Sequence, residues 1–234
     1  MATFVLVHGA WHGGWCWARA APLLRDAGHQ VHTPTLSGHG ERAHFLASEV
    51  DLDTNVRDVL AVLTYEDLRD VVLVGHSYGG MVITAVADRM PERLAHVVYL
   101  DAFIPEAGQC VLDLVPPERA TTFRDGARAS ADGRSVPALP LEVWGVTDPG
   151  DVEWAASRIS PQPLGTLTQP VHCEGADATS LPRTYIGTDY VAFRRFAERA
   201  RTDLGWRSRH LPTGHDAMIT MPRELVALLL EIAG

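Results

Sequence analysis

A serine lies between two glycines in the sequence GHSYG at residues 75–79. This G-x-S-x-G spacing can form a strained turn that raises a serine hydroxyl above the edge of a sheet. The apolar residues 71–74 precede it and the largely apolar residues 81–90 follow it, so the sequence predicts a strand, a turn and a helix. We therefore predict that Ser77 is a nucleophile that attacks a carbonyl carbon.

A serine hydroxyl becomes an effective nucleophile only when a base removes its proton. In a strand–turn–helix arrangement of this kind the base is a histidine late in the chain. Of the eleven histidines, His215 has that position, after the predicted strand 206–211 and before the predicted helix 222–232. The alternative is His210, which lies inside the predicted strand.

A third residue must orient the imidazole and stabilise its charged form. Asp189 follows the predicted strand 184–186 and precedes His215 in the chain, so we expect it to be this acid. The alternative acid is Asp101, which follows the predicted strand 96–100. If Asp101 does not orient the base, it braces the serine turn or a neighbouring segment by hydrogen bonding.

Acyl transfer also needs two N–H groups that stabilise the oxyanion. We expect them to be the backbone groups of Tyr78, next to the nucleophile, and of Ala10, in the loop after the first apolar run. A small-molecule pocket should be mainly apolar. The residues predicted to line it are Trp11, Tyr78, Phe103, Trp144, Trp154 and Met218. For the tryptophans, packing in the core is the alternative.

Short apolar segments alternate with amphipathic ones along the chain, which predicts an α/β fold with helices on both faces of a mostly parallel, six-stranded sheet. The predicted strands are residues 4–7, 30–33, 71–74, 96–100, 184–186 and 206–211. The predicted helices are residues 17–27, 55–65, 81–90 and 222–232. Residues 105–182 break the alternation, and we expect them to form a small cap inserted into a single domain of residues 1–234.

Composition and charge narrow the classes of function. The chain has 234 residues and a formal charge of −9, which disfavours binding to nucleic acid. The first residues have no basic segment or cleavage pattern, and no apolar run reaches the ~18 residues of a membrane span. We therefore expect a soluble, cytoplasmic protein. The three cysteines lack metal-ligand spacing, so no metal is expected. The sequence does not determine the oligomeric state, and a homodimer is one possibility.

Five segments together resemble the α/β-hydrolase superfamily: MATFVLVHGAWHGGWCW, PTLSGHGE, LVGHSYGGMV, TYIGTD and GHDAM. The resemblance is to the small branch with plant hydroxynitrile lyases, methylesterases such as the salicylate-binding esterase, and related bacterial esterases. It spans nearly the whole chain and is weakest in the expected cap. It implies Ser77, Asp189 and His215 as nucleophile, acid and base, Ala10 and Tyr78 as oxyanion donors, a cap over an apolar pocket, and no cofactor.

Two positions differ from the cyanide-releasing members, which carry a threonine at the position of Gly9 and a lysine at that of Asp216. The lysine stabilises departing cyanide and an aspartate would repel it, so both differences favour ester hydrolysis. Asp216 either raises the basicity of His215 or is a solvated loop acid or helix cap.

We therefore expect a serine hydrolase that cleaves a small, apolar or aromatic carboxylic ester, or a related carbamate or amide, through an acyl-enzyme. The alternatives are a hydroxynitrile lyase and a non-catalytic receptor for small ligands on the same fold.

Overall fold

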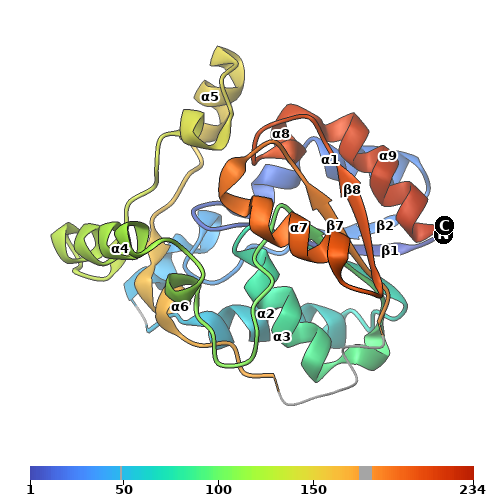
Figure 1. The fold of residues 1–234 in the computed structure, drawn as a ribbon, viewed down its shortest axis with the longest axis horizontal. Coiled ribbons are helices and arrows are strands. Elements are labelled where there is room, and N and C mark those ends of the chain that lie inside the picture. The colour runs from blue at the N-terminus through green and yellow to red at the C-terminus, as the bar shows by residue number, and fades with distance from the viewer. Residues whose placement is uncertain (48, 174–180) are drawn as a thin grey trace.

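The computed structural model describes residues 1–47, 49–173 and 181–234 (Figure 1). Its centre is a six-stranded sheet with the order β2-β1-β3-β4-β7-β8, and each neighbouring pair runs parallel. The predicted α/β fold is thereby confirmed. The strands are β1 (Thr3–Val7), β2 (Gln30–His32), β3 (Val71–His76), β4 (Leu94–Leu100), β7 (Arg183–Gly187) and β8 (Trp206–His210).

Helices cover both faces of this sheet: Figure 1 shows α2 and α3 on one side and α1 and α9 on the other. Helix α2 begins three residues before the predicted start, because the Asp51 side chain accepts a hydrogen bond from the Thr54 N–H (2.8 Å) and caps it. The helices are α1 (Ala20–Asp26), α2 (Leu52–Tyr65), α3 (Gly79–Arg89), α7 (Arg194–Thr202), α8 (Ala217–Thr220) and α9 (Pro222–Ala233).

Residues 105–182, called the insert below, lie between β4 and β7, and residues 174–180 of it lie outside the described residues. Its helices α4 and α5 stand apart from the sheet, α4 on the left and α5 at the top of Figure 1. The sequence indicated no strand here, but β5 and β6 form a short antiparallel pair. The elements are α4 (Pro117–Ala129), β5 (Ser135–Val136), α5 (Pro149–Ala156), β6 (Gln162–Pro163) and α6 (Leu164–Thr168).

Short 3₁₀ helices occur in the connections, at Gly14–Trp17, Gly40–Ala47, Pro91–Arg93, Val111–Asp113, Leu141–Trp144 and Val191–Phe193. None of the helices in the described ranges is long and apolar enough to cross a lipid bilayer.

The parallel sheet brings distant loops to one edge. Strand β3 is buried at every position, as its continuous apolar sequence predicts for a central parallel strand. Because all six strands run in one direction, their carboxyl ends meet at the same edge, where parallel sheets usually bind ligands. The loops after β1, β3, β4, β7 and β8 therefore lie at this edge, and they carry the predicted catalytic residues and oxyanion donors.

Candidate active site

Ser77 lies on a strained turn directly after β3. Its φ of +54° is in the left-handed region, which is rare for a residue with a side chain. The turn also brings backbone segments very close together, because a Cβ at Gly75 would lie 2.7 Å from the carbonyl oxygen of Gly79. The glycines thus allow strand and helix to approach, and the Ser77 side chain is left on the wall of a cavity.

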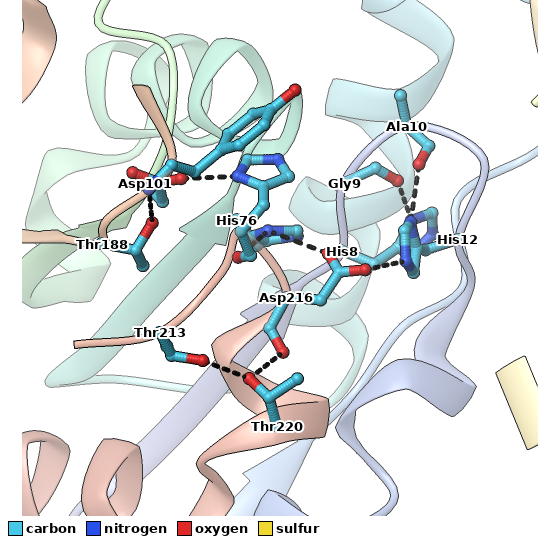
Figure 2. Close-up of polar contacts among 12 residues, drawn as sticks. His8, Gly9, Ala10, His12, His76, Asp101, Thr188, Thr213, Asp216 and Thr220 are labelled. Carbon is cyan, nitrogen blue, oxygen red and sulfur yellow. Dashed lines mark hydrogen bonds and ion pairs between the residues drawn. The ribbon is translucent and has the colours of Figure 1, made fainter. Parts of the chain in front are cut away.

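The His215 side chain is held from several directions. Its backbone N–H donates to the carbonyl of Trp144 (2.7 Å), and its ring stacks on Phe193 with a centroid distance of 4.8 Å. Nδ1 lies 2.6 Å from Oδ2 of Asp101, which is itself buried (Figure 2). With Nδ1 occupied by the carboxylate, Nε2 is the ring nitrogen left for chemistry.

The prediction that Asp189 orients His215 is wrong in this structure. The Asp189 side chain is 64% exposed, and its Oδ1 lies 3.1 Å from Nε2 of His210. The alternative base is thereby also displaced from the site, since His210 pairs with Asp189 at the surface. Asp101, the alternative acid, contacts His215 instead, because its side chain is buried against the His215 ring, whereas that of Asp189 points to the surface.

Ser77 and His215 line the same cavity. No hydrogen bond joins the Ser77 hydroxyl to the His215 ring in this structure. Such contacts are often long in unliganded enzymes and shorten when substrate binds. The arrangement therefore brings the predicted nucleophile and the predicted base to one surface, with the imidazole of His215 oriented by a buried carboxylate.

Ala10 and Tyr78 line the same cavity, and neither backbone N–H has a hydrogen-bond acceptor within the described ranges. The Tyr78 side chain points elsewhere: it is buried, and its hydroxyl donates to Oδ1 of Asn55 (3.0 Å). Two unpaired N–H groups beside a serine are suited to binding an oxyanion. Helix α3 begins at Gly79 and adds positive potential at its N-terminus.

The cavity has a volume of about 150 Å³ and a mainly apolar, aromatic wall. Of the predicted lining residues, Trp11, Tyr78, Phe103 and Trp144 are on this wall. Further aromatic residues on it were not predicted, among them Phe123 of α4, Tyr190 and Phe193. For Phe123 the apolar face of α4 was a usable signal, because Ala120, Phe123 and Ala127 follow a helical spacing.

Two predicted lining residues lie elsewhere. Trp154 packs edge-on against Trp15 (5.3 Å between ring centroids) and contacts the guanidinium group of Arg19. Met218 is fully buried in the core on α8. Both predictions relied on nearness in sequence to the cap or to His215, and side-chain direction overrides such nearness.

Gly9 and Asp216 occupy very different surroundings. A Cβ at Gly9 would lie 2.8 Å from Nδ1 of His76 and 2.9 Å from Cβ of Ser77, so a side chain does not fit there. Asp216 is fully buried, makes no side-chain cap to α8 and is not on the cavity wall. Its interpretation as a solvated loop acid or helix cap is therefore wrong.

Three buried side chains near the site have possible metal-ligand atoms within 4.8 Å of one another: His76, His215 and Asp216. Two of the three are already engaged. Nδ1 of His215 contacts Asp101, and Nε2 of His76 donates to the carbonyl of His215 (3.1 Å). The group therefore has the chemistry of a hydrogen-bonded cluster that supports the His215 loop.

Comparison with known proteins finds matches to a protein family and to relatives along nearly the whole chain. Residues 4–228 match the alpha/beta hydrolase family. A carbendazim hydrolyzing esterase from Nocardioides sp. (strain SG-4G) is 45% identical over 99% of this chain and 100% of its own length. Salicylic acid-binding protein 2 of Nicotiana tabacum is 36% identical over 44% of this chain and 40% of its own length.

The solved structures that are similar to this chain include hydrolases as well. An extracellular alpha/beta-hydrolase from a Paenibacillus species superposes with a TM-score of 0.85 at 26% identity, covering 99% of this chain and 98% of that one. A pyrethroid hydrolase from Sphingobium faniae superposes with a TM-score of 0.79 at 26% identity, covering 99% and 97%. The chain therefore belongs to the alpha/beta hydrolase family, and it is a carboxylesterase-type hydrolase.

Proposed function

We propose that this hydrolase works through a serine nucleophile, with Ser77 as nucleophile, His215 as general base and Asp101 as the acid that orients it. The observation that supports this most is the fixed imidazole of His215. Its Nδ1 lies 2.6 Å from Asp101, and its ring shares a cavity with a serine on a strained turn. This is the nucleophile–base–orienter geometry of acyl-transfer enzymes.

The reaction proceeds in two halves. Ser77 Oγ attacks the carbonyl carbon while Nε2 of His215 takes the hydroxyl proton, and the N–H groups of Ala10 and Tyr78 stabilise the oxyanion. Collapse of this intermediate expels the alcohol, which receives the proton from His215, and leaves an acyl group on Ser77. A water molecule then attacks the acyl-enzyme and gives one proton to His215. The bond between the acyl carbon and Ser77 Oγ breaks, His215 returns the proton to Oγ, and the carboxylic acid leaves.

The substrate class follows from the cavity. A space of about 150 Å³ between Trp11, Phe123 and Trp144 suits a small aromatic or apolar group beside the scissile bond. A relative that aligns with 99% of this chain is, by its name, a carbendazim hydrolyzing esterase, and carbendazim is an aromatic carbamate. We therefore propose small aromatic or apolar esters and carbamates as substrates.

Lyase chemistry is the weaker candidate. A threonine at position 9, as in the resembling cyanide-releasing enzymes, would overlap Cβ of Ser77, because even a Cβ would lie 2.9 Å from it. A non-catalytic receptor is also a weaker candidate function, since ligand binding alone needs neither a strained serine nor an oriented imidazole. The geometry favours hydrolysis.

The test is hydrolysis of phenyl acetate and methyl phenylcarbamate by the wild type and Ser77→Ala. We expect Ser77→Ala to lose on the order of 10³-fold or more in kcat/KM, because the nucleophile is gone. A fluorophosphonate probe should label Ser77 and leave the Ser77→Ala protein unlabelled. Ser157→Ala, a change at an exposed serine, is the matched control and should keep full activity. Near-normal turnover by Ser77→Ala would disprove the proposal.

A further inference from the structure

The Ala10 N–H belongs to a peptide whose other end is held by a buried histidine. Nδ1 of His8 donates to the carbonyl of Gly9 (2.8 Å), and Nε2 of His8 accepts from the N–H of Leu36 (3.0 Å). A trans peptide is planar, so its C=O and N–H point in opposite directions. The hydrogen bond to the Gly9 carbonyl therefore directs the Ala10 N–H toward the cavity.

The next peptide is held at both ends. Nδ1 of His12 donates to the carbonyl of Ala10 (2.7 Å), and the N–H of Trp11 donates to Oε1 of Gln162 on β6 (2.9 Å). Trp11 has a φ of +63°, a conformation that persists only when its surroundings impose it. His12 and Gln162 supply that constraint from opposite sides, and together with His8 they fix the loop that presents the Ala10 N–H.

His12 has an acidic partner that the mechanism above does not use. Oδ2 of Asp216 lies 3.3 Å from Nε2 of His12, and both side chains are buried; Figure 2 draws Asp216 between His12 and His76. The contact is an ion pair without good hydrogen-bond geometry. The Trp15 ring stacks on the His12 ring (5.3 Å between centroids), which is favourable for a cation.

The charges of the two groups are consistent with an ion pair. Burial alone would lower the pKa of His12, but Asp216 raises it above the usual value. Burial would raise the pKa of Asp216, and His12 outweighs it and lowers the pKa to about 2. His76, the other ring near Asp216, has its pKa lowered well below the usual value by burial and by His215. A buried carboxylate needs such a compensating charge.

We infer that His12 and Asp216 form a positioning pair for the oxyanion hole: Asp216 holds His12, and His12 holds the Ala10 carbonyl so that the Ala10 N–H faces the reacting oxygen. The inference rests on the proposed serine mechanism. Asp216 directly follows His215 in the chain, so the loop that carries the base also supports the oxyanion loop. This explains a buried acid at that position better than an effect on His215 basicity alone.

The test compares two double variants that both lack the buried charges. His12→Asn/Asp216→Asn keeps an amide donor where Nδ1 of histidine was, and His12→Leu/Asp216→Asn keeps the bulk without a donor. The readouts are kcat and KM for p-nitrophenyl acetate and the affinity for trifluoroacetophenone, a ketone that forms an oxyanion adduct with an active serine. Active-site titration with a fluorophosphonate corrects for folded enzyme.

We expect the leucine variant to have a kcat roughly 10- to 100-fold below that of the asparagine variant, because a small misplacement of a reacting group has costs of this order. KM should agree within about threefold, and the affinity for trifluoroacetophenone should fall by the same factor as kcat/KM, since both depend on the oxyanion donors. A third variant, His12→Gln/Asp216→Asn, places the side-chain amide one methylene farther from the backbone. Its kcat should resemble that of the leucine variant, and it serves as a control for a folding failure.

Equal kcat values in the asparagine and leucine variants, or a difference confined to KM or to the melting temperature, would overturn the positioning pair. The Ser77→Ala protein, assayed alongside, separates this failure from that of the proposed function. If it is inactive, only the positioning pair falls; if it turns over normally, the serine mechanism falls and the pair with it.

Discussion

Gly9 lies where the first strand's loop meets the serine turn. A Cβ there would be 2.8 Å from the His76 ring and 2.9 Å from Cβ of Ser77, which is part of the strained turn. The same peptide carries the Ala10 N–H. Gly9 therefore limits both the position of the proposed nucleophile, Ser77, and that of the proposed oxyanion donor, the Ala10 N–H.

Gly9→Ala should lower kcat for p-nitrophenyl acetate by roughly 10- to 100-fold, because the added methyl group must displace Ser77 or the loop. The melting temperature should also fall, since overpacking a filled region costs on the order of 1–3 kcal/mol. Kinetics and thermal unfolding of the purified variant measure both. A fully active, equally stable Gly9→Ala protein would show that the space around Gly9 is larger than the structure indicates.

At the scale of elements, helix α4 of the insert forms one side of the cavity. Phe123 is buried on its inner face, and its ring lies edge-on to that of Trp11 with 5.6 Å between centroids. Trp11 in turn stacks on Trp144 (5.4 Å), which comes from a separate 3₁₀ helix. The insert and the loop after β1 thus build one aromatic wall, and the size of the acyl or alcohol group should depend on it.

Phe123→Ala should therefore broaden the accepted substrates. We expect the ratio of kcat/KM for naphthyl acetate to that for phenyl acetate to rise about tenfold, since a change of pocket volume usually alters discrimination by roughly 1–3 kcal/mol. Hydrolysis of the two esters by the variant and the wild type gives this ratio. An unchanged ratio would place the bulky group of the substrate away from α4.

The strands were predictable from sequence because β1, β3 and β4 are short apolar runs that end in polar or glycine residues. The sequence signal for the edge strand β8 was weaker, because this strand is less hydrophobic, but the strand was still recognisable. The insert was not predictable in detail, because its short strands β5 and β6 pair across more than twenty residues and have no periodicity of their own. Its contact with Trp11 through Gln162 is equally non-local.

The site was predictable only where its residues lie in local sequence patterns. Ser77 lies in a local motif, and His215 has a characteristic place before the last helix. The acid could not be chosen from spacing, because Asp101 and Asp189 both follow strands of one parallel sheet, and only the directions of their side chains in the structure distinguish them. Asp216 lies in a polar loop sequence, and its burial results from a partner, His12, near the other end of the chain.

At the scale of the whole molecule, the buried His12–Asp216 pair makes stability depend on pH. The pKa of Asp216 falls from 3.8 to about 2 on folding, so its contribution is present above pH 3.8 and is lost as the pH falls toward 2. The pKa of His12 is raised above 6.5, so its contribution is present below pH 6.5 and is lost as the pH rises through the folded value.

The difference in unfolding free energy between wild type and Asp216→Asn should therefore be largest between about pH 4 and pH 6.5, at about 2 kcal/mol, from the size of the Asp216 shift. It should shrink at lower and at higher pH. Urea unfolding across this range measures it, and the titratable groups away from Asp216 cancel because both proteins contain them. A difference that does not vary with pH would mean that the two groups are not charged together.

The account depends on the carboxylate that orients His215, and Asp101→Asn and Asp189→Asn test it directly as a matched pair of isosteric changes. With kcat/KM measured side by side on p-nitrophenyl acetate, Asp101→Asn should lose on the order of 10³–10⁴-fold, because the amide favours the wrong imidazole tautomer. Asp189→Asn, at an exposed side chain that contacts His210, should stay within about twofold of wild type, as is usual for surface changes. The reverse pattern, with Asp189→Asn inactive and Asp101→Asn active, would contradict the account.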